Sequence, residues 1–348
     1  MKDLFRGDDK IRKYLAKQAK TPVPEQEKKL LWGRIEQSVL NIAPQRRPLR
    51  TFLWTAASVC ILIMAAAILF FSTPVGEVQL ASTFPDESIV MQKIKKEETV
   101  KLITVTGEEI IFDGDEPEII AGNYSKEEDI TENEQPRLNQ LIVPTGKKTS
   151  LILEDGTKLW VNSDSKVIYP EKFAKDQRLI IVDGEIYADV SHDKTRPFIA
   201  KTRDMQVQVL GTEFNLTAYS TDNAQSVILV SGKVEVTPGE RTPEILKPNS
   251  ILTLSDNNVK IKKNIDVYNY ICWKDDILVL DGIYLEDLIQ RINRHYGNEI
   301  TIDKELAQRR LSGKLDLKNP VEDLMKTLSV SLNCKYSFSE NRYIINSY

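Results

Sequence analysis

The sequence predicts a multidomain membrane protein with a short α-helical N-terminal arm, one transmembrane helix, an all-β region and a C-terminal α+β domain. Three observations predict this layout. Residues 52–71 form a run of twenty residues without a charge, a proline or a glycine. Residues 141–265 contain short runs of Val, Ile, Leu and Thr separated by turn-forming glycines. Residues 270–348 combine two amphipathic helical stripes with short strand patterns.

The apolar run reads FLWTAASVCILIMAAAILFF. At a rise of about 1.5 Å per residue, a helix of this length covers the roughly 30 Å hydrocarbon core of a bilayer. A buried core helix would show a polar stripe, but this run has only Thr55 and Ser58. A cleaved signal peptide would have a shorter apolar core, of about 7–15 residues. A lipoprotein signal is disfavoured because Val59 precedes Cys60 where a small residue is expected. The run is therefore predicted to span the membrane, with Phe52 and Phe71 at its ends and Trp54 as an interfacial anchor.

Charge predicts the orientation of this helix. Residues 1–50 contain 13 Lys and Arg against 6 Asp and Glu, and the rest of the chain contains 34 against 45. Arg46, Arg47 and Arg50 lie just before the apolar run, whereas residues 72–90 contain no Lys or Arg. The positive-inside rule then places residues 1–50 in the cytoplasm and residues 72–348 outside it. The acidic outer part is a poor binder of nucleic acid.

The N-terminal arm, residues 1–50, is predicted to form two short helices separated by Pro22 and Pro24. Each has one apolar face, and two helices of this size cannot bury a core of their own. We expect the arm to dock onto a partner, with a membrane-surface helix as the alternative. The residues expected to contact the partner are Leu15, Leu31, Trp32, Ile35 and Val39.

Residues 72–140 are predicted to be a tether with a β-hairpin and an acidic linker. Residues 102–113 of this hairpin look like a weak copy of residues 151–162. The β region, residues 141–265, fits either a solenoid-like stack or a sandwich. Its corners are expected at Gly156, Gly184, Gly211 and Gly232, because glycine readily adopts a positive φ.

The C-terminal domain, residues 270–348, is predicted to have a βαβ-βαβ-like order. A first strand over 277–280 is expected to end at Asp281 and Gly282, and a hairpin is expected around Glu340 and Asn341. One helix has Leu285, Leu288, Ile289 and Ile292 on one face; the other follows Pro320 and has Val321, Leu324, Met325 and Leu328.

No sequence pattern predicts catalysis, a cofactor or a metal site. The chain lacks the zinc-protease, nucleophile-elbow and phosphate-loop motifs, and it contains only two histidines. His192, between Ser191 and Asp193, is expected in a solvated turn. Cys272 and Cys334 are expected to be small buried residues, although a single bridge between them is possible in an oxidising compartment.

Six segments of the β region, in order, resemble the FecR family of anti-sigma regulators: VPTG (143–146), LEDGTKLWVN (153–162), YPEKF (169–173), GEIY (184–187), RPF (196–198) and VLGTEFN (209–215). The last seventy residues are similar to the short domain found in secretins and TonB-dependent receptors. Ala188 departs from the family pattern, which usually has an aromatic residue there, and indicates a local change in packing. The N-terminal arm matches the family in size, helical character and Trp32.

This resemblance implies a single-pass protein of the bacterial inner membrane and no enzymatic activity. It implies that the arm binds an extracytoplasmic-function sigma factor. The outer part would receive a signal from the signalling domain of a TonB-dependent outer-membrane receptor, and envelope proteases would release the arm. The family residues expected to have structural roles are Gly156, Gly184, Glu185, Gly211, Thr212, Phe214 and Asn215. The alternatives are a membrane-anchored enzyme acting on envelope glycans and a structural adaptor.

Overall fold

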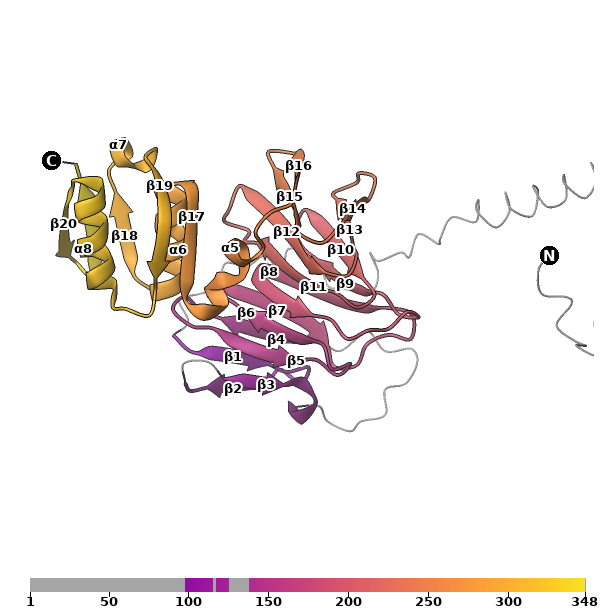
Figure 1. Cartoon of the computed structure of the whole chain (residues 1–348). Coiled ribbons are helices and arrows are strands. Elements are labelled where there is room, and N and C mark those ends of the chain that lie inside the picture. Colours follow the sequence, from indigo (N-terminus) through magenta and orange to yellow (C-terminus); the bar gives the residue numbers. More distant parts are fainter. Residues whose placement is uncertain (1–97, 115–116, 125–137, 348) are drawn as a thin grey trace, which may run out of the picture. The chain divides into compact units, whose positions relative to one another are not determined.

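The structure is a computed structural model that describes residues 98–114, 117–124 and 138–347 (Figure 1). These residues all belong to one compact unit, Gln79–Tyr348. No helix within them is long and apolar enough to cross a membrane. Two groups of predicted residues lie outside the described part: the partner-binding candidates Leu15, Leu31, Trp32, Ile35 and Val39, and the membrane-helix residues Phe52, Trp54 and Phe71.

Sixteen strands within the described residues form two ladders that share strand β8 (Figure 1). The first ladder has the order β2 (Glu109–Phe112), β1 (Val100–Ile103), β4 (Leu138–Val143), β7 (Ser165–Pro170), β8 (Arg178–Asp189), β9 (Phe198–Lys201), β10 (Met205–Val209), β13 (Val234–Pro238) and β14 (Glu244–Leu246). The second has the order β3 (Glu118–Ile120), β5 (Thr149–Ile152), β6 (Lys158–Val161), β8, β11 (Glu213–Ala218), β12 (Ala224–Ser231), β15 (Ser250–Ser255) and β16 (Asn258–Lys263). A 3-10 turn, η2 (Ala121–Tyr124), follows β3.

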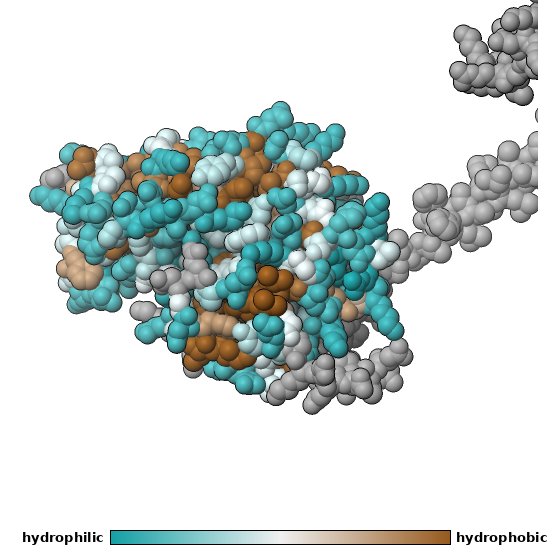
Figure 2. All heavy atoms as spheres, turned by 60° about the horizontal axis from the view of Figure 1, so that its bottom comes forward, coloured by the Kyte–Doolittle hydropathy of each residue, from teal (hydrophilic) through white to brown (hydrophobic). Residues whose placement is uncertain are grey.

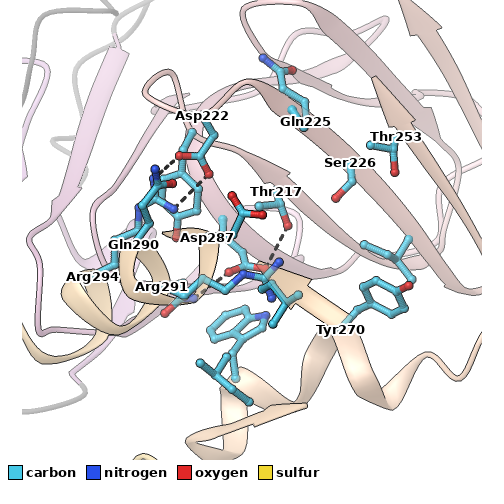
Figure 3. A pocket seen from close by; sticks show the side chains of 18 of the residues that line it. Thr217, Asp222, Gln225, Ser226, Thr253, Tyr270, Asp287, Gln290, Arg291 and Arg294 are labelled. Atoms are coloured by element: carbon cyan, nitrogen blue, oxygen red, sulfur yellow. Dashed lines mark hydrogen bonds and ion pairs between the residues drawn. The ribbon is translucent and has the colours of Figure 1, made fainter. Parts of the chain in front are cut away.

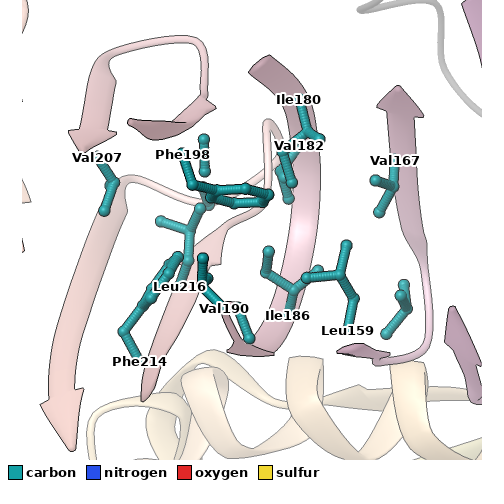
Figure 4. Close-up of a cluster of buried hydrophobic side chains, with 14 of the residues drawn as sticks. Leu159, Val167, Ile180, Val182, Ile186, Val190, Phe198, Val207, Phe214 and Leu216 are labelled. Atoms are coloured by element: carbon teal, nitrogen blue, oxygen red, sulfur yellow. The ribbon is translucent and has the colours of Figure 1, made fainter. Parts of the chain in front are cut away.

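The two ladders pack face to face around a shared apolar core (Figure 4). Val167 and Val182 of the first ladder and Leu159 and Ile186 of the second are all 0% exposed and belong to the same cluster. Alternate residues of each strand point inward, as the period-2 pattern predicts. Of the two predicted forms, the structure therefore has the sandwich.

The predicted boundary at residue 141 is not where the β fold begins. Strand β1 pairs with β4, and its Val100 and Leu102 are 0% exposed in the sandwich core. Strand β3, from the predicted acidic linker, pairs in parallel with β5. The weak sequence copy is confirmed as two hairpins, β1–β2 and β5–β6, in which Leu102 faces Ile110 and Leu151 faces Leu159.

Gly184 lies inside a strand instead of at the predicted turn. Residues Arg178–Asp189 form one twelve-residue strand, β8, whose first half pairs with β7 and β9 and whose second half pairs with β6 and β11. Gly184, with φ of 127°, stands where the strand leaves the first ladder and enters the second. The residues before and after Gly184 are both mostly apolar and buried, the first group in one sheet and the second in the other. They therefore form one continuous strand and not two strands joined by a turn.

The C-terminal part contains α5 (Tyr268–Ile271), η3 (Cys272–Asp275), β17 (Ile277–Tyr284), α6 (Leu285–Tyr296), β18 (Glu299–Ile302), α7 (Lys304–Ala307), β19 (Arg310–Asp316), α8 (Val321–Leu332), β20 (Lys335–Ser339) and β21 (Arg342–Asn346). The predicted apolar faces of α6 and α8 are confirmed, since both share one core with strands of two ladders, β17–β19 and β18–β21–β20.

The strand pairing of this part differs from the predicted βαβ pattern. The parallel pair is β18 with β21, whereas β17 pairs antiparallel with β19. Asp281 and Gly282 do not end the first strand, because β17 continues to Tyr284 across a register shift between Leu280 and Ile283. The hairpin turn at Glu340 and Asn341 is confirmed, with φ of 51° and 61°.

The outer strands of the sandwich are protected unequally. Strand β16 carries Lys260, Lys262 and Lys263, and lysines on an outer strand discourage pairing with other chains. Strands β2 and β3 instead expose Ile111 and Ile120 at 57% and 42%. Figure 2 shows apolar side chains gathered on the face where these two strands lie.

Candidate functional site

The candidate site is the junction where α6 and η3 pack against the second ladder and neighbouring loops of the sandwich. It is built from residues far apart in the sequence, and several belong to the segments that carry the resemblance. One of those segments also forms the turn before β6. Asp155 accepts hydrogen bonds from the Thr157 amide at 3.0 Å and from Arg178 Nη1 at 2.7 Å. Arg178 is 0% exposed, so Gly156, with φ of 81°, sits in a turn held by a buried ion pair.

Gly184 allows the closest backbone approach in the site. A Cβ atom there would lie 2.2 Å from Ser165 Oγ and 2.6 Å from Ser165 Cα, so only glycine fits. The Glu185 amide donates a hydrogen bond to Ser165 Oγ at 2.9 Å. This contact ties β7 to β8 at the point where β8 changes ladder, and it orients the Glu185 side chain.

The Glu185 carboxylate is the centre of a polar network on the outer face of the second ladder. One oxygen accepts a hydrogen bond from Asn162 Nδ2 at 2.8 Å. The other accepts from Asn215 Nδ2 and Thr217 Oγ1, both at 3.0 Å. Asn162 lies in the loop after β6, and Asn215 and Thr217 lie on β11. The carboxylate of Glu185, on β8, therefore links three adjacent chain segments.

Asn215 connects this hydrogen-bond network to the C-terminal part. Its side chain is 0% exposed, and its Oδ1 accepts a hydrogen bond from Trp273 Nε1 at 3.0 Å. Lys274, the next residue of η3, places Nζ 3.4 Å from the centre of the Tyr187 ring. Lys148 reaches Asp276 at 2.5 Å, which adds an ion pair beside the indole.

Arg294 of α6 makes the second anchor (Figure 3). Its guanidinium pairs with Asp222 and lies 3.7 Å from the centre of the Tyr219 ring. The backbone carbonyl of Arg294 also accepts a hydrogen bond from the Gly146 amide at 2.7 Å. A donor at this position suits the negative C-terminal end of a helix.

Gly211, Thr212 and Phe214 make contacts within the sandwich. A Cβ on Gly211 would lie 2.4 Å from the His192 ring, so the loop after β10 packs directly on the loop after β8. Thr212 Oγ1 donates to the Lys233 carbonyl at 3.0 Å. Phe214 is 0% exposed in the sandwich core and pairs with Ala188, whose small side chain is also buried.

Comparison with known proteins identifies the family. A model described as FecR protein matches residues 139–235, and one described as FecR, C-terminal, matches residues 277–345. These two segments belong to the FecR family. Two crystal structures of a "putative anti-sigma factor" from Parabacteroides distasonis ATCC 8503 are similar to this chain. The first is 29% identical, covers 61% of this chain and 99% of its own, and has a TM-score of 0.57. The second is 28% identical, covers 60% of this chain and 99% of its own, and has a TM-score of 0.56. No curated protein matches the chain. The family and these neighbours support an anti-sigma regulator.

Two carboxylates at the junction are used for positioning. Both Glu185 oxygens accept hydrogen bonds from the protein, and Asp222 is paired with Arg294. Within the described residues no three His, Cys, Asp or Glu side chains come together as a metal site. Cys272 and Cys334 are both buried and unbridged.

Sequence reasoning missed three residues of this site: Trp273, Lys274 and Arg294. Trp273 had a detectable signal, because a lone tryptophan between a cysteine and three charged residues is out of place in a solvated linker. Arg294 had none, since it stands on the polar face of α6, where an arginine is ordinary.

Proposed function

We propose that this chain is a single-pass inner-membrane anti-sigma regulator. In this proposal, residues 1–50 bind an extracytoplasmic-function sigma factor in the cytoplasm, and residues 52–71 cross the membrane. The outer part receives a signal from the signalling domain of a TonB-dependent receptor, and envelope proteases then release the arm. The chain acts by binding and not by catalysis. The observation that carries the proposal is the ordered match of both FecR family models, together with the similarity to solved anti-sigma-type structures over nearly their whole length.

The charge distribution supports the cytoplasmic half. The arm has a net charge of +7 and the remainder of −11, and the apolar run divides them. A basic amphipathic arm without a core of its own is suited to completing its burial on another protein.

The first test is retention of a sigma factor by the full chain. We expect the chain to co-purify with an extracytoplasmic-function sigma factor from the same genome, and Trp32→Ala to weaken the complex at least about tenfold, because buried tryptophans often dominate interfaces. Gln37→Ala is the control, since residue 37 lies opposite residues 31, 35 and 39 on the predicted helix. If no such sigma factor binds, or if both variants bind equally well, the assignment of the arm fails.

The outer end of the β18–β21–β20 ladder supports a role in receiving the receptor. Strand β20 pairs only with β21 within the described residues, so its other side is open to strand addition. Phe338 on β20 and Val330 on α8 are 57% and 83% exposed. Exposed apolar groups beside an open strand suit a protein partner.

We expect Phe338→Asp to reduce binding of the receptor's signalling domain about tenfold or more while leaving sigma-factor retention unchanged. Binding would be measured by calorimetry with the full chain. Lys335→Asp, on the same strand, controls for a general effect of negative charge. Unchanged receptor binding in Phe338→Asp would place the contact elsewhere and leave the sigma-binding test unaffected.

A further inference from the structure

A cavity of about 440 Å³ lies between the outer face of the second ladder and the helix α6 (Figure 3). Its floor is formed by side chains of β8, β11, β12 and β15, and its roof by α5, η3 and α6. Small-molecule sites usually have volumes of about 300–1,000 Å³ and lie between packed elements. The size and the place of this cavity are therefore those of a ligand site.

Short polar side chains form part of the floor. Thr217, Ser226 and Thr253 line the cavity from three adjacent strands (Figure 3). The larger apolar residues Ile228 and Ile251 lie on the same floor. The floor therefore combines small hydroxyl groups with apolar surface.

The roof is polar as well. Asp287, Gln290, Arg291 and Arg294 follow the i, i+3, i+4, i+7 spacing, so they form one stripe along α6. The apolar stripe of the same helix is buried in the C-terminal core. The polar stripe lines one side of the cavity, where Asp287, Gln290 and Arg291 are also exposed to solvent and Arg294 is half-buried.

Some of these groups are already used, and others are available. Arg294 is held by Asp222, as described above. Arg291 and Asp287 make no hydrogen bond or ion pair with other described residues, and the same holds for the Ser226 and Thr253 hydroxyls. Burial raises the pKa of Asp287, and neighbouring Glu286 raises it further, while Arg291 lowers it.

We propose that this cavity binds a small, uncharged, polyhydroxylated molecule, of the size of a monosaccharide or disaccharide. Arg291 offers hydrogen-bond donors in a planar fork and Asp287 offers acceptors, while the Ser226 and Thr253 hydroxyls can donate or accept. Neighbouring hydroxyl groups of a sugar both donate and accept hydrogen bonds, so they need donors and acceptors side by side. The Tyr270 ring at the side of the cavity adds an apolar face for C–H groups.

The lining disfavours strongly charged ligands. Three anionic side chains, Glu185, Asp222 and Asp287, stand against three cationic ones, Lys262, Arg291 and Arg294. An anion drawn to Arg291 would approach Asp287, and a cation drawn to Asp287 would approach Arg291. A neutral ligand satisfies both groups without this penalty.

A ligand in the cavity would contact the sandwich and α6 at once. It would therefore stabilise their packing by mass action, since only the packed arrangement forms the complete site. The proposal rests on the cavity and does not require the proposed sigma-factor or receptor contacts.

The test uses the full chain in a detergent without sugar groups. Glucose, galactose, mannose, xylose, maltose and cellobiose are titrated by saturation-transfer NMR and calorimetry up to about 10 mM, a range that detects millimolar affinities. Glucuronate and inorganic phosphate are the charged probes. We expect at least one neutral sugar to bind more tightly than either charged probe.

Two variants locate the binding. Arg291→Gln removes the available fork, and we expect it to weaken the sugar about tenfold or more. Ser226→Leu fills the cavity from the floor, and we expect it to abolish binding. Arg342→Gln on β21, outside the cavity, is the control and should bind as the unaltered chain does. Circular dichroism checks that each variant is folded, and Arg291 is exposed enough for its variant to fold.

Three results would overturn the proposal. One is that no neutral sugar of the set binds at about 10 mM. Another is that glucuronate or phosphate binds more tightly than every neutral sugar, which would assign the cavity to anions. The third is that Arg291→Gln binds the sugar as well as Arg342→Gln does, which would place the sugar elsewhere on the chain.

Discussion

Replacing Gly184 by Ala is expected to destabilise the sandwich by about 3–4 kcal/mol, a large part of the stability of an ordinary domain. The new Cβ would meet the Cα atom of Ser165 at 2.6 Å, and no side-chain rotation relieves a clash with backbone. The positive φ of 127° adds strain of about 1 kcal/mol. Urea unfolding of residues 79–348, followed by circular dichroism, measures the change in the free energy of unfolding.

Gly239→Ala is the matched control for this prediction. Gly239 also has a positive φ, 56°, but nothing lies within 4 Å of its missing Cβ. It should lose only about 1 kcal/mol, the cost of backbone strain alone. Adding Ser165→Gly to Gly184→Ala removes the side-chain atoms of residue 165 from the clash but leaves its backbone in place, so recovery should be partial. Equal losses in Gly184→Ala and Gly239→Ala would show that close approach at the strand crossing is unimportant.

Replacing Glu185 by Gln is expected to cost about 2–4 kcal/mol and to loosen the C-terminal part from the sandwich. The carboxylate accepts hydrogen bonds on both oxygens, whereas an amide offers one acceptor and one NH₂ group. The new NH₂ group must then face the amide donor of either Asn162 or Asn215, whereas the Thr217 hydroxyl can turn to accept from it. Because Asn215 also holds Trp273, we expect faster proteolysis between residues 263 and 277 as well as reduced stability.

Glu235→Gln on β13 provides the comparison. Glu235 is also partly buried on a strand of the sandwich, but it makes no hydrogen bond or ion pair with another described residue. It should change the free energy of unfolding by less than about 0.5 kcal/mol. A similar result for Glu185→Gln would mean that solvent replaces the lost acceptor, and the network would not be the link between the two parts.

Local features of the fold were accessible from the sequence. The apolar stripes of α6 and α8 follow the helical period, and Pro320 and Gly297 mark a beginning and an end. The turn at Glu340 and Asn341 shows in its polar residues between two strand patterns. Each of these signals depends on neighbours within one element.

The missed features depend on contacts between distant segments. Strand β1 has the composition of an isolated hairpin strand, and only its pairing with β4 places it in the core. Gly184 resembles a turn glycine because sequence alone does not show Ser165 lying against it. The cavity could not be predicted either, because Thr217, Ser226 and Thr253 are ordinary residues for the outer face of a sheet.

The sharing of β8 between the two ladders has a mechanical consequence. Its first half is hydrogen-bonded between β7 and β9 and its second half between β6 and β11, so the sheets cannot slide past each other without breaking pairs on both. The sandwich is therefore stiff against shear. Trp273 and Arg294 attach the C-terminal part to this stiff sandwich, so we expect a force on the C-terminal part to act on both sheets together.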